Sequence, residues 1–343
     1  MVFCRKWTTL IIILFIVTLM VPVPGFAGKT ALERGQEITF LVPYSAGGGY
    51  DAYARLIAPF WTAEIKKETG VDVKIIVRNM PGAGGDIAYT KLNRTRPDNI
   101  TVCIAQIQGA LGFQMFRSAP YDVLKWTYIG QVQADSPGMI VRSDTKLFSF
   151  KEILTRSQKS PIVVGTAGYG DGTHMNPELL KNILARDNIK INFKYVHYKG
   201  YSKVRAALQR GEVEAAFGTT ESFMTLYDEG KAHLVLVFDS KRKPFNPAVP
   251  TIMDYGLLHA DEILDALIIP RAIVGPPNMK QPVIALLRKT FKSALEQETF
   301  RQKAFLAQRP LDYLSAEALK ERIENKTAVF KKHEKLLKPL IGE

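Results

Sequence analysis

The 343-residue sequence has few cysteines and, beyond its first residues, no long apolar run. One of its two cysteines, Cys4, lies in a segment that we expect to be removed, so the mature chain keeps only Cys103 and cannot form an internal disulfide. No later segment has the roughly 20 apolar residues that a membrane-spanning helix needs. Low-complexity linkers and short-period repeats are also missing, which excludes fibrous and repeat architectures.

The common signatures of catalysis and nucleotide binding are missing as well. The sequence has no Gly-x-Ser-x-Gly elbow and no His-Glu-x-x-His motif, and no other histidine has metal-ligand spacing to His174. The three glycines at 47–49 do not form a Walker loop, because no Lys-Ser or Lys-Thr follows them. We therefore predict that the chain is not an enzyme and needs neither a cofactor nor a metal ion.

The charge is strongly positive, with 46 Lys and Arg against 33 Asp and Glu and a formal net charge of +13. The basic residues are scattered, and no nucleic-acid-binding motif accompanies them, so we expect no nucleic-acid partner. Two interpretations stay open: a positive field that helps to collect small anions, and a surface that is merely basic.

The first 27 residues predict a secretory signal peptide. Arg5 and Lys6 precede an apolar run at residues 10–21, and the small residues Gly25 and Ala27 follow it. This order predicts cleavage after Ala27 and export to the periplasm; the alternative is an uncleaved membrane anchor.

A glycine-rich stretch between a strand and a helix organises the rest of the chain. Residues 38–42 are an apolar run typical of a strand, and apolar residues recur at helical spacing from Tyr53 onward. Glycines let a ligand approach the backbone, and the N–H groups of the following helix favour an anion. Asp51 serves as a helix cap or would suit a ligand amino group. The predicted ligand-binding residues of this first loop are Ser45, Ala46, Gly47, Gly48, Gly49, Tyr50 and Asp51.

A second unit repeats this pattern, with a predicted strand at residues 161–166 and a predicted helix from Met175. The glycine loop between them contributes Gly168, Tyr169, Gly170, Gly172 and Thr173 to the predicted site. Polar residues that follow two further strands complete it, because ligands bind beyond the carboxyl ends of strands in such sheets. These residues are Gln106, Thr219, Thr220 and Glu221; Glu221 would pair with a ligand amine or cap a helix.

Strands alternate with helices along the chain, which predicts two α/β lobes whose parallel-rich sheets have helices on both faces. We expect the chain to cross between the lobes at residues 126–141 and to return at residues 243–250, with a strand at residues 264–274. The predicted domains are the signal peptide (1–27), a discontinuous first lobe (28–131 and 245–343) and a second lobe (132–244).

These motifs, in this order, resemble the substrate-binding proteins of tripartite tricarboxylate transporters, the Bug family. The segments that carry the resemblance are residues 42–51, 78–85, 168–174, 196–200, 208–214, 249–251 with Gly256, and 275–277. The sequence departs from the family pattern at Ser45, where the loop usually starts Pro-Gly-Gly, and at His197, where proline is usual. It departs again at Tyr50, which replaces a small hydroxyl residue and would stack on an aromatic acid or cover a small one.

The resemblance implies a type II periplasmic binding-protein fold, with the ligand between two lobes that are joined by two crossing strands. It also implies a small organic acid as ligand and the membrane permease subunits of a tripartite tricarboxylate transporter as partners; we expect a monomer. Two alternatives stay open: an adaptor that presents its ligand to a membrane sensor kinase, and an exported hydrolase.

Overall fold

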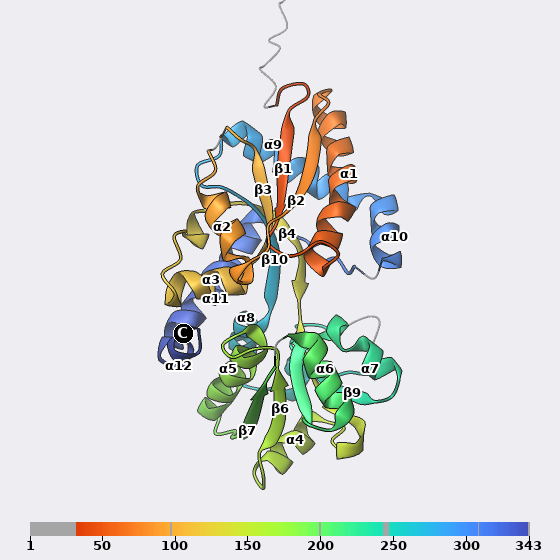
Figure 1. Cartoon of the computed structure of the whole chain (residues 1–343), viewed down its shortest axis with the longest axis vertical. Helices are drawn as coiled ribbons and strands as arrows, with labels where there is room; N and C mark the ends of the chain where they lie inside the picture. The colour runs from red at the N-terminus through yellow and green to blue at the C-terminus, as the bar shows by residue number, and fades with distance from the viewer. Residues whose placement is uncertain (1–31, 97, 199, 243–246, 308, 342–343) are drawn as a thin grey trace, which may run out of the picture. The chain divides into compact units, whose positions relative to one another are not determined.

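The structure is a computed structural model that describes residues 32–96, 98–198, 200–242, 247–307 and 309–341, without the side chain of Glu221. The chain divides into two compact units, residues 1–30 and 31–343, and the description below concerns the second. The predicted signal peptide lies outside the described residues. Two β-sheets with helices around them make up the second unit (Figure 1). Within the described ranges, no helix is long and apolar enough to cross a membrane.

The first sheet has six strands in the order β11-β4-β10-β3-β1-β2. Strand β1 pairs in parallel with β2 and β3, whereas β10 runs antiparallel to β3 and β4. The strands are β1 Glu37–Val42, β2 Lys74–Asn79, β3 Thr101–Gln106, β4 Thr127–Asp135, β10 Ile269–Gly275 and β11 Leu314–Ser315.

Helices cover both faces of this sheet, because its buried strands turn alternate side chains to opposite faces. In β1, Phe40 packs with α1 and α9, whereas the next residue, Leu41, belongs to the cluster formed with α2 and α11. Trp61 of α1 stands edge-on to Phe40, with ring centroids 6.0 Å apart. The helices are α1 Gly49–Thr69, α9 Gln281–Glu296 and α10 Glu298–Leu306 on one face, and α2 Asp86–Asn93, α3 Ile107–Phe116 and α11 Ala316–Lys332 on the other.

The second sheet has five strands in the order β7-β6-β8-β5-β9. Strand β6 pairs in parallel with β7 and β8, and β5 runs antiparallel to β8 and β9. The strands are β5 Pro137–Arg142, β6 Ile162–Thr166, β7 Phe193–His197, β8 Ala215–Thr219 and β9 Ala232–Val237.

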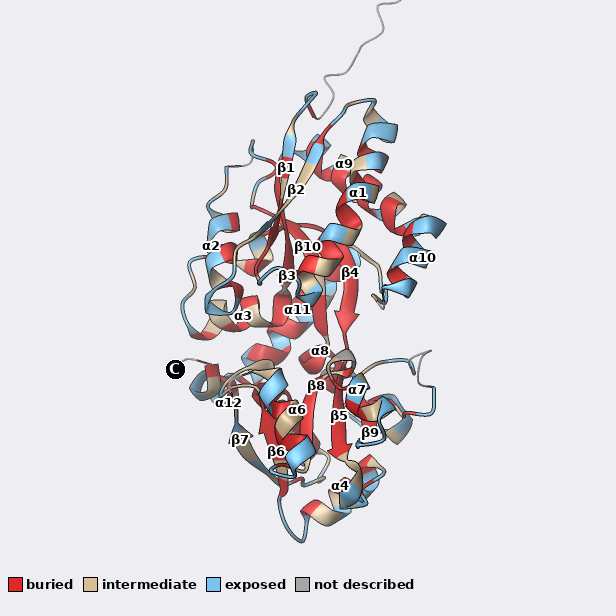
Figure 2. Cartoon of the chain, turned by 45° about the vertical axis from the view of Figure 1, so that its right-hand side comes forward, coloured by how far each residue is buried: buried red, intermediate tan, exposed pale blue. Residues whose placement is uncertain are grey.

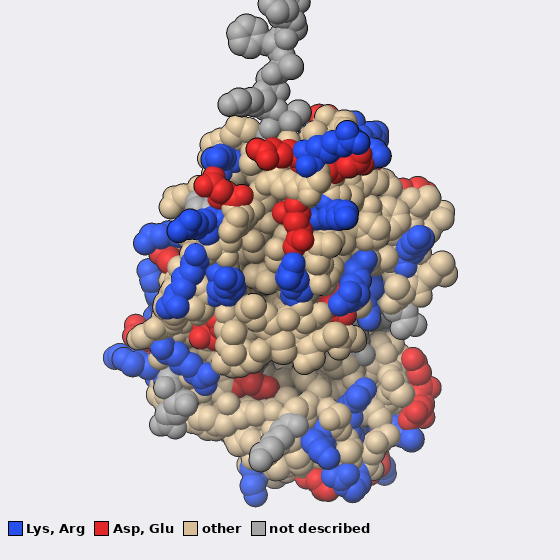
Figure 3. Space-filling view, turned by 45° about the horizontal axis from the view of Figure 1, so that its top comes forward, with Lys and Arg blue, Asp and Glu red and all other residues tan. Residues whose placement is uncertain are grey.

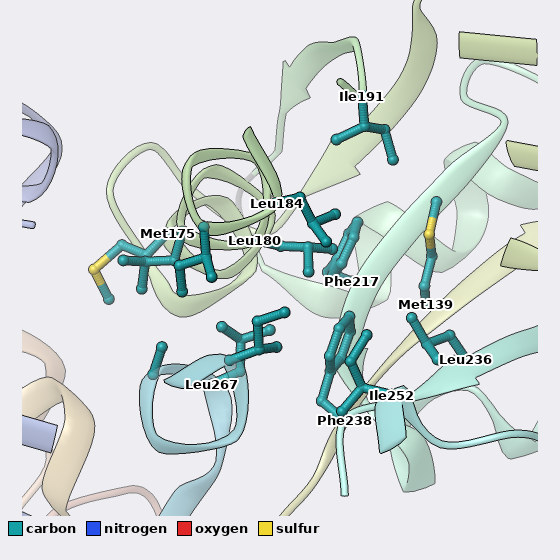
Figure 4. Packing of buried hydrophobic residues seen from close by; sticks show 14 of the residues in the cluster. Met139, Met175, Leu180, Leu184, Ile191, Phe217, Leu236, Phe238, Ile252 and Leu267 are labelled. Atoms are coloured by element: carbon teal, nitrogen blue, oxygen red, sulfur yellow. The ribbon is translucent and has the colours of Figure 1, made fainter. Parts of the chain in front are cut away.

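The largest apolar cluster covers one face of the second sheet. Phe217 of the sheet lies beside Leu180 of α5, and Met139 of the sheet and Leu267 of α8 belong to the same cluster (Figure 4). Ile140 belongs to a cluster with α6 on the other face. Most strands of both sheets are buried along most of their length (Figure 2), whereas the edge strands β2 and β7 are only partly buried. The helices are α4 Phe150–Ser157, α5 Gly172–Arg186, α6 Tyr201–Arg210, α7 Met224–Asp228 and α8 Ala260–Leu267. Short 3₁₀ helices are η1 Ala83–Gly85, η2 Val123–Lys125, η3 Ser143–Thr145, η4 Thr220–Ser222 and η5 Ile252–Tyr255.

The chain changes sheet at Ser136, between β4 and β5, and at Ile268, between α8 and β10. The first position lies in the extended stretch predicted at residues 126–141.

The return predicted at residues 243–250 is wrong, since the described part of that segment stays beside β9, where the Val237 N–H donates to the Pro250 carbonyl. The strand predicted at residues 264–274 begins later, at the start of β10, because the apolar residues before it complete α8. A short apolar run alone does not show whether a segment is a helix or a strand. The domain limit at 131/132 stays a prediction, whereas the limit at 244/245 fails together with the predicted return, because Ile252, Ile263 and Leu267 still pack in the cluster of the second sheet.

The last described helix, α12 Glu334–Ile341, contacts α3 beside the first sheet and α5 beside the second. The Arg117 guanidinium donates to the Ile341 carbonyl. The Leu340 carbonyl lies so close to Gly170 that a Cβ on this glycine would be 1.6 Å from its oxygen. The C-terminal helix therefore contacts elements of both lobes.

Candidate ligand-binding cleft

A cavity of about 530 Å³ lies between the two lobes, and both predicted glycine loops reach it. Its visible opening is lined mainly by uncharged atoms, with an acidic group in its depth and with Lys and Arg mostly around it (Figure 3). The predicted site residues that line the cavity are Gly48, Gly49, Tyr50, Gln106, Gly170, Gly172, Thr173 and Thr219. A smaller cavity of about 370 Å³ shares Gly49, Tyr50, Thr219, Ser222 and Arg271 with it.

The other predicted site residues are not among the described residues of the cavity wall: Ser45, Ala46, Gly47, Asp51, Gly168, Tyr169 and Thr220. Tyr169 is about half exposed, and its ring lies against His174 and His197. Thr220 is buried, with a hydroxyl that has no hydrogen-bond partner among the described residues. The side chain of Glu221 lies outside the described part of the structure.

The first glycine loop leaves the start of α1 without a side-chain cap. Its N-cap is Gly48, which has no side chain to accept from the first-turn N–H groups. Asp51, predicted as the cap, lies inside the helix and accepts instead from Gly47 N (2.8 Å), Arg55 Nε (2.9 Å) and Asn79 Nδ2 (2.9 Å). Burial would raise the pKa of Asp51, but these hydrogen bonds outweigh it and lower the pKa below its ordinary value. The N–H groups of Gly49 and Tyr50 are thus placed to receive an anion.

The second glycine loop is already capped by its own carboxylate. Asp171 is the N-cap of α5, and its Oδ1 accepts from Thr173 N at 3.0 Å, His174 N at 3.2 Å and Thr173 Oγ1 at 2.6 Å. The Gly170 N–H donates to His174 Nδ1 at 3.2 Å. Burial raises the pKa of Asp171, against the opposing effect of the hydrogen bonds from Thr173 and His174. The anion position at the start of α5 is therefore filled by the chain itself.

A buried ion pair stands where the crossing strands reach the cavity. Arg271 of β10 donates through Nε to Asp135 Oδ2 at 2.8 Å, and its Nη2 lies 2.7 Å from Asp135 Oδ1. The two side chains are 12% and 3% exposed. Burial alone would lower the pKa of Arg271, but the adjacent Asp135 carboxylate outweighs it and raises the pKa. The guanidinium stays charged, and its charge is matched by the carboxylate.

Aromatic rings form much of the remaining wall. Tyr44 and Tyr50 lie with ring centroids 4.7 Å apart, and the Arg271 guanidinium stands 4.5 Å from the centre of the Tyr50 ring. Burial raises the pKa of Tyr44 to about 12, so its phenol is neutral. Phe113 and Tyr201 also line the cavity. The Tyr201 hydroxyl donates to the Phe217 carbonyl at 3.0 Å, next to Gly218, where any side chain would meet the tyrosine.

Two amide side chains connect the lobes at the cavity wall. Gln108 Nε2 at the start of α3 donates to Asn176 Oδ1 of α5 at 2.9 Å, and both residues are almost fully buried. Gln106, one of the predicted site residues, uses its Oε1 to cap α3 by accepting from Gly109 N. Gln108 Oε1 has no partner among the described residues, which makes it an acceptor for a ligand group.

The prediction from sequence missed Asp135 and Arg271, and of the aromatic wall it included Tyr50 alone; it also left Asp171 out of the site. A charged residue inside an apolar strand, such as Arg271, was a usable signal, because buried arginines need a partner. Its partner could not be identified, because Asp135 is 136 residues away in the chain. Within the described ranges, no group of three His, Cys, Asp or Glu residues could hold a metal ion.

Comparison with known structures defines the class of protein first. A crystal structure of a TctC solute-binding protein from Polaromonas superposes with a TM-score of 0.70 and 19% identity, covering 87% of this chain and 98% of that one. A Rhodopseudomonas palustris protein, Rpa4515 with adipate, superposes with a TM-score of 0.67 and 20% identity, covering 88% and 97%. The predicted fold is confirmed: this is the two-lobed architecture of the periplasmic solute-binding proteins.

The family follows from the sequence match. Residues 62–334 match the family described as "Tripartite tricarboxylate transporter family receptor", so the chain belongs to this receptor family, TctC. A Cupriavidus necator protein, described as "UPF0065 protein in gbd 5'region", is 25% identical over 273 residues, which cover 77% of this chain and 76% of that protein. The resemblance noted from the glycine motifs is thereby confirmed.

Proposed function

We propose that this protein is a periplasmic receptor that binds a small organic carboxylate between its lobes and delivers it, chemically unchanged, to a tripartite tricarboxylate transporter. Two findings support this proposal: the chain belongs to the receptor family, and the Rhodopseudomonas palustris protein with the same fold holds adipate.

The observation that carries the proposal is the uncapped start of α1 at the wall of the cavity. Gly48 and Gly49 expose backbone without side chains there, and the helix dipole adds partial positive charge. One ligand carboxylate would accept from the first-turn N–H groups of α1, and the second lobe would cover it. Because these donors are backbone groups, they bind an anion without supplying a nucleophile or a base.

Binding is tested with mature protein by isothermal titration calorimetry against a panel of carboxylates, with the corresponding amides and alcohols as uncharged controls. We expect at least one carboxylate to bind, its uncharged analogue to fail, and the ligand to be recovered unchanged. Binding of uncharged compounds alone, or turnover of the bound compound, would contradict the proposal. Delivery is tested by uptake of the labelled ligand into vesicles that contain the permease subunits, with and without the receptor.

A further inference from the structure

The cavity offers one open anion position rather than two. At the start of α1 the N-cap is a glycine, so the N–H groups are available to a ligand. At the start of α5 the Asp171 carboxylate already accepts from Thr173 N and His174 N. A second ligand carboxylate at that end would face a buried carboxylate of the chain instead of free donors.

The described part of the cavity wall also has no spare cation. Among the described residues that line it, Arg271 is the one Lys or Arg, and it is bound to Asp135 through two nitrogen–oxygen contacts. A second ligand carboxylate would have to compete with Asp135, which is 3% exposed and held at 2.7–2.8 Å. Arg309 lines the smaller neighbouring cavity and is not among the described residues of the larger one.

The wall around the open anion position is apolar and rich in rings. Tyr44, Tyr50, Phe113 and Tyr201 line the cavity, together with Met175 and Ile269. Gln108 Oε1 has no hydrogen-bond partner among the described residues. Other polar groups of the wall are bonded to one another, as in the Arg271–Asp135 ion pair and the Thr219–Ser222 hydroxyl pair, and are therefore less available to a ligand. Such a wall favours an apolar ligand body, with aromatic rings packing edge-on or offset against its own.

We propose that the ligand is a monocarboxylate with an apolar, ring-bearing body, and not a di- or tricarboxylate. The carboxylate binds at the start of α1, and the body lies among the tyrosines, Phe113 and Met175. This inference rests on the proposed function and narrows it to one class of organic acid.

The test is a calorimetric titration with two ligands that share a ring and differ in one group: 4-methylbenzoate and terephthalate. We expect 4-methylbenzoate to bind at least 10-fold more tightly, and to exceed adipate by a similar factor. Equal or tighter binding of terephthalate or adipate would overturn the inference and leave the proposed function standing. If no carboxylate of the wider panel binds, the proposed function itself fails.

Two substitutions test why the second carboxylate is rejected. Asp171→Asn keeps a good N-cap but removes its charge, so terephthalate binding should rise at least 5-fold relative to 4-methylbenzoate. Asp122→Asn makes the same change at the N-cap of η2, which does not line the cavity, and should leave the ratio unchanged. An unchanged ratio in Asp171→Asn would overturn the charge argument.

The aromatic wall is tested separately. Tyr50→Phe keeps the ring and should bind 4-methylbenzoate within 3-fold of the parent, whereas Tyr50→Leu should weaken this binding about 10-fold. Circular dichroism and the thermal midpoint check that both variants are folded. Equal affinity of two folded variants would contradict the role of the ring.

Discussion

The two glycine loops occupy equivalent places in the two lobes, yet they meet the cavity in opposite electrostatic states. Each follows a strand and opens a helix. Helix α1 begins at Gly48 without a side-chain cap, whereas α5 begins at Asp171, whose carboxylate accepts from the N–H groups of Thr173 and His174. The acidic residue of the first loop, Asp51, turns away to Gly47, Arg55 and Asn79. Similar sequence motifs therefore produce one receiving loop and one self-capped loop.

The largest expected effect concerns the packing of the second loop. Gly170 has φ +70°, and an added Cβ would collide with the Leu340 carbonyl, whereas Gly47 has φ +81° and open space around it. Gly170→Ala should lower the free energy of unfolding by about 3 kcal/mol, from steric overlap plus strain, and Gly47→Ala by about 1 kcal/mol, from strain alone. Urea denaturation of both variants measures the difference. Equal losses would show that the C-terminal helix does not press on this loop in solution.

The second prediction concerns a substitution that gives the first loop a carboxylate cap like the one in the second loop. Gly48→Asp gives α1 a carboxylate cap in extended backbone geometry, with φ −76° and ψ 169°, so that the chain itself fills the anion position. Carboxylate affinity should fall about 100-fold, which corresponds to about 2.7 kcal/mol. Gly48→Ala leaves the N–H groups free and serves as the control in the same titration. If Gly48→Asp bound carboxylates as well as Gly48→Ala, the receiving loop would lie elsewhere.

The third prediction concerns the residue that braces the first loop. Asp51→Ala leaves Gly47 N, Asn79 Nδ2 and the Arg55 guanidinium without their acceptor, so the free energy of unfolding should fall by about 2 kcal/mol. Asp72→Ala removes an exposed partner of Lys66 and should cost less than about 1 kcal/mol. Chemical denaturation of the two variants gives the comparison. A larger loss in Asp72→Ala would contradict the bracing role.

The smallest expected effect is a loss of stability at mildly acidic pH, which arises at the second loop and not at the first. Burial, followed by the neighbouring His197, lowers the pKa of His174 to about 4, below the roughly 6.5 of an unfolded histidine. The unfolded chain therefore takes up the proton first, and stability falls as the pH drops from about 6.5 towards 4. We expect a loss of about 1 kcal/mol between pH 7 and pH 5.5. The pKa of Asp51 is lowered, so the first loop keeps its brace in that range.

Thermal unfolding across this pH range measures the loss, with His174→Gln as the variant. The loss attributed to His174 should disappear in His174→Gln, and an unchanged slope would assign it to another group.

The fold was largely predictable because its signals are local. Apolar runs, glycine turns and helical spacing located both loops and the stretch at residues 126–141 that contains the crossing at Ser136. Cleft features that depend on distant residues were not predictable: Arg271 meets Asp135 across 136 residues, and Gln108 meets Asn176 across 68. The N-caps of α1 and α5 could not be predicted either, for a different reason. Asp51 and Asp171 both lie at the end of a glycine-rich stretch, and only the backbone conformation decides which aspartate becomes the N-cap.

Helix α12 has a mechanical consequence for ligand exchange. The two strand connections at Ser136 and Ile268 allow a hinge, but α12 adds a third attachment, between Arg117 on one side and Gly170 on the other. Any rotation that pulls the two loops apart on this side has to break that attachment or pivot about it. The end of the chain thereby takes part in the mechanics of ligand exchange, although it lies far from the loops in sequence.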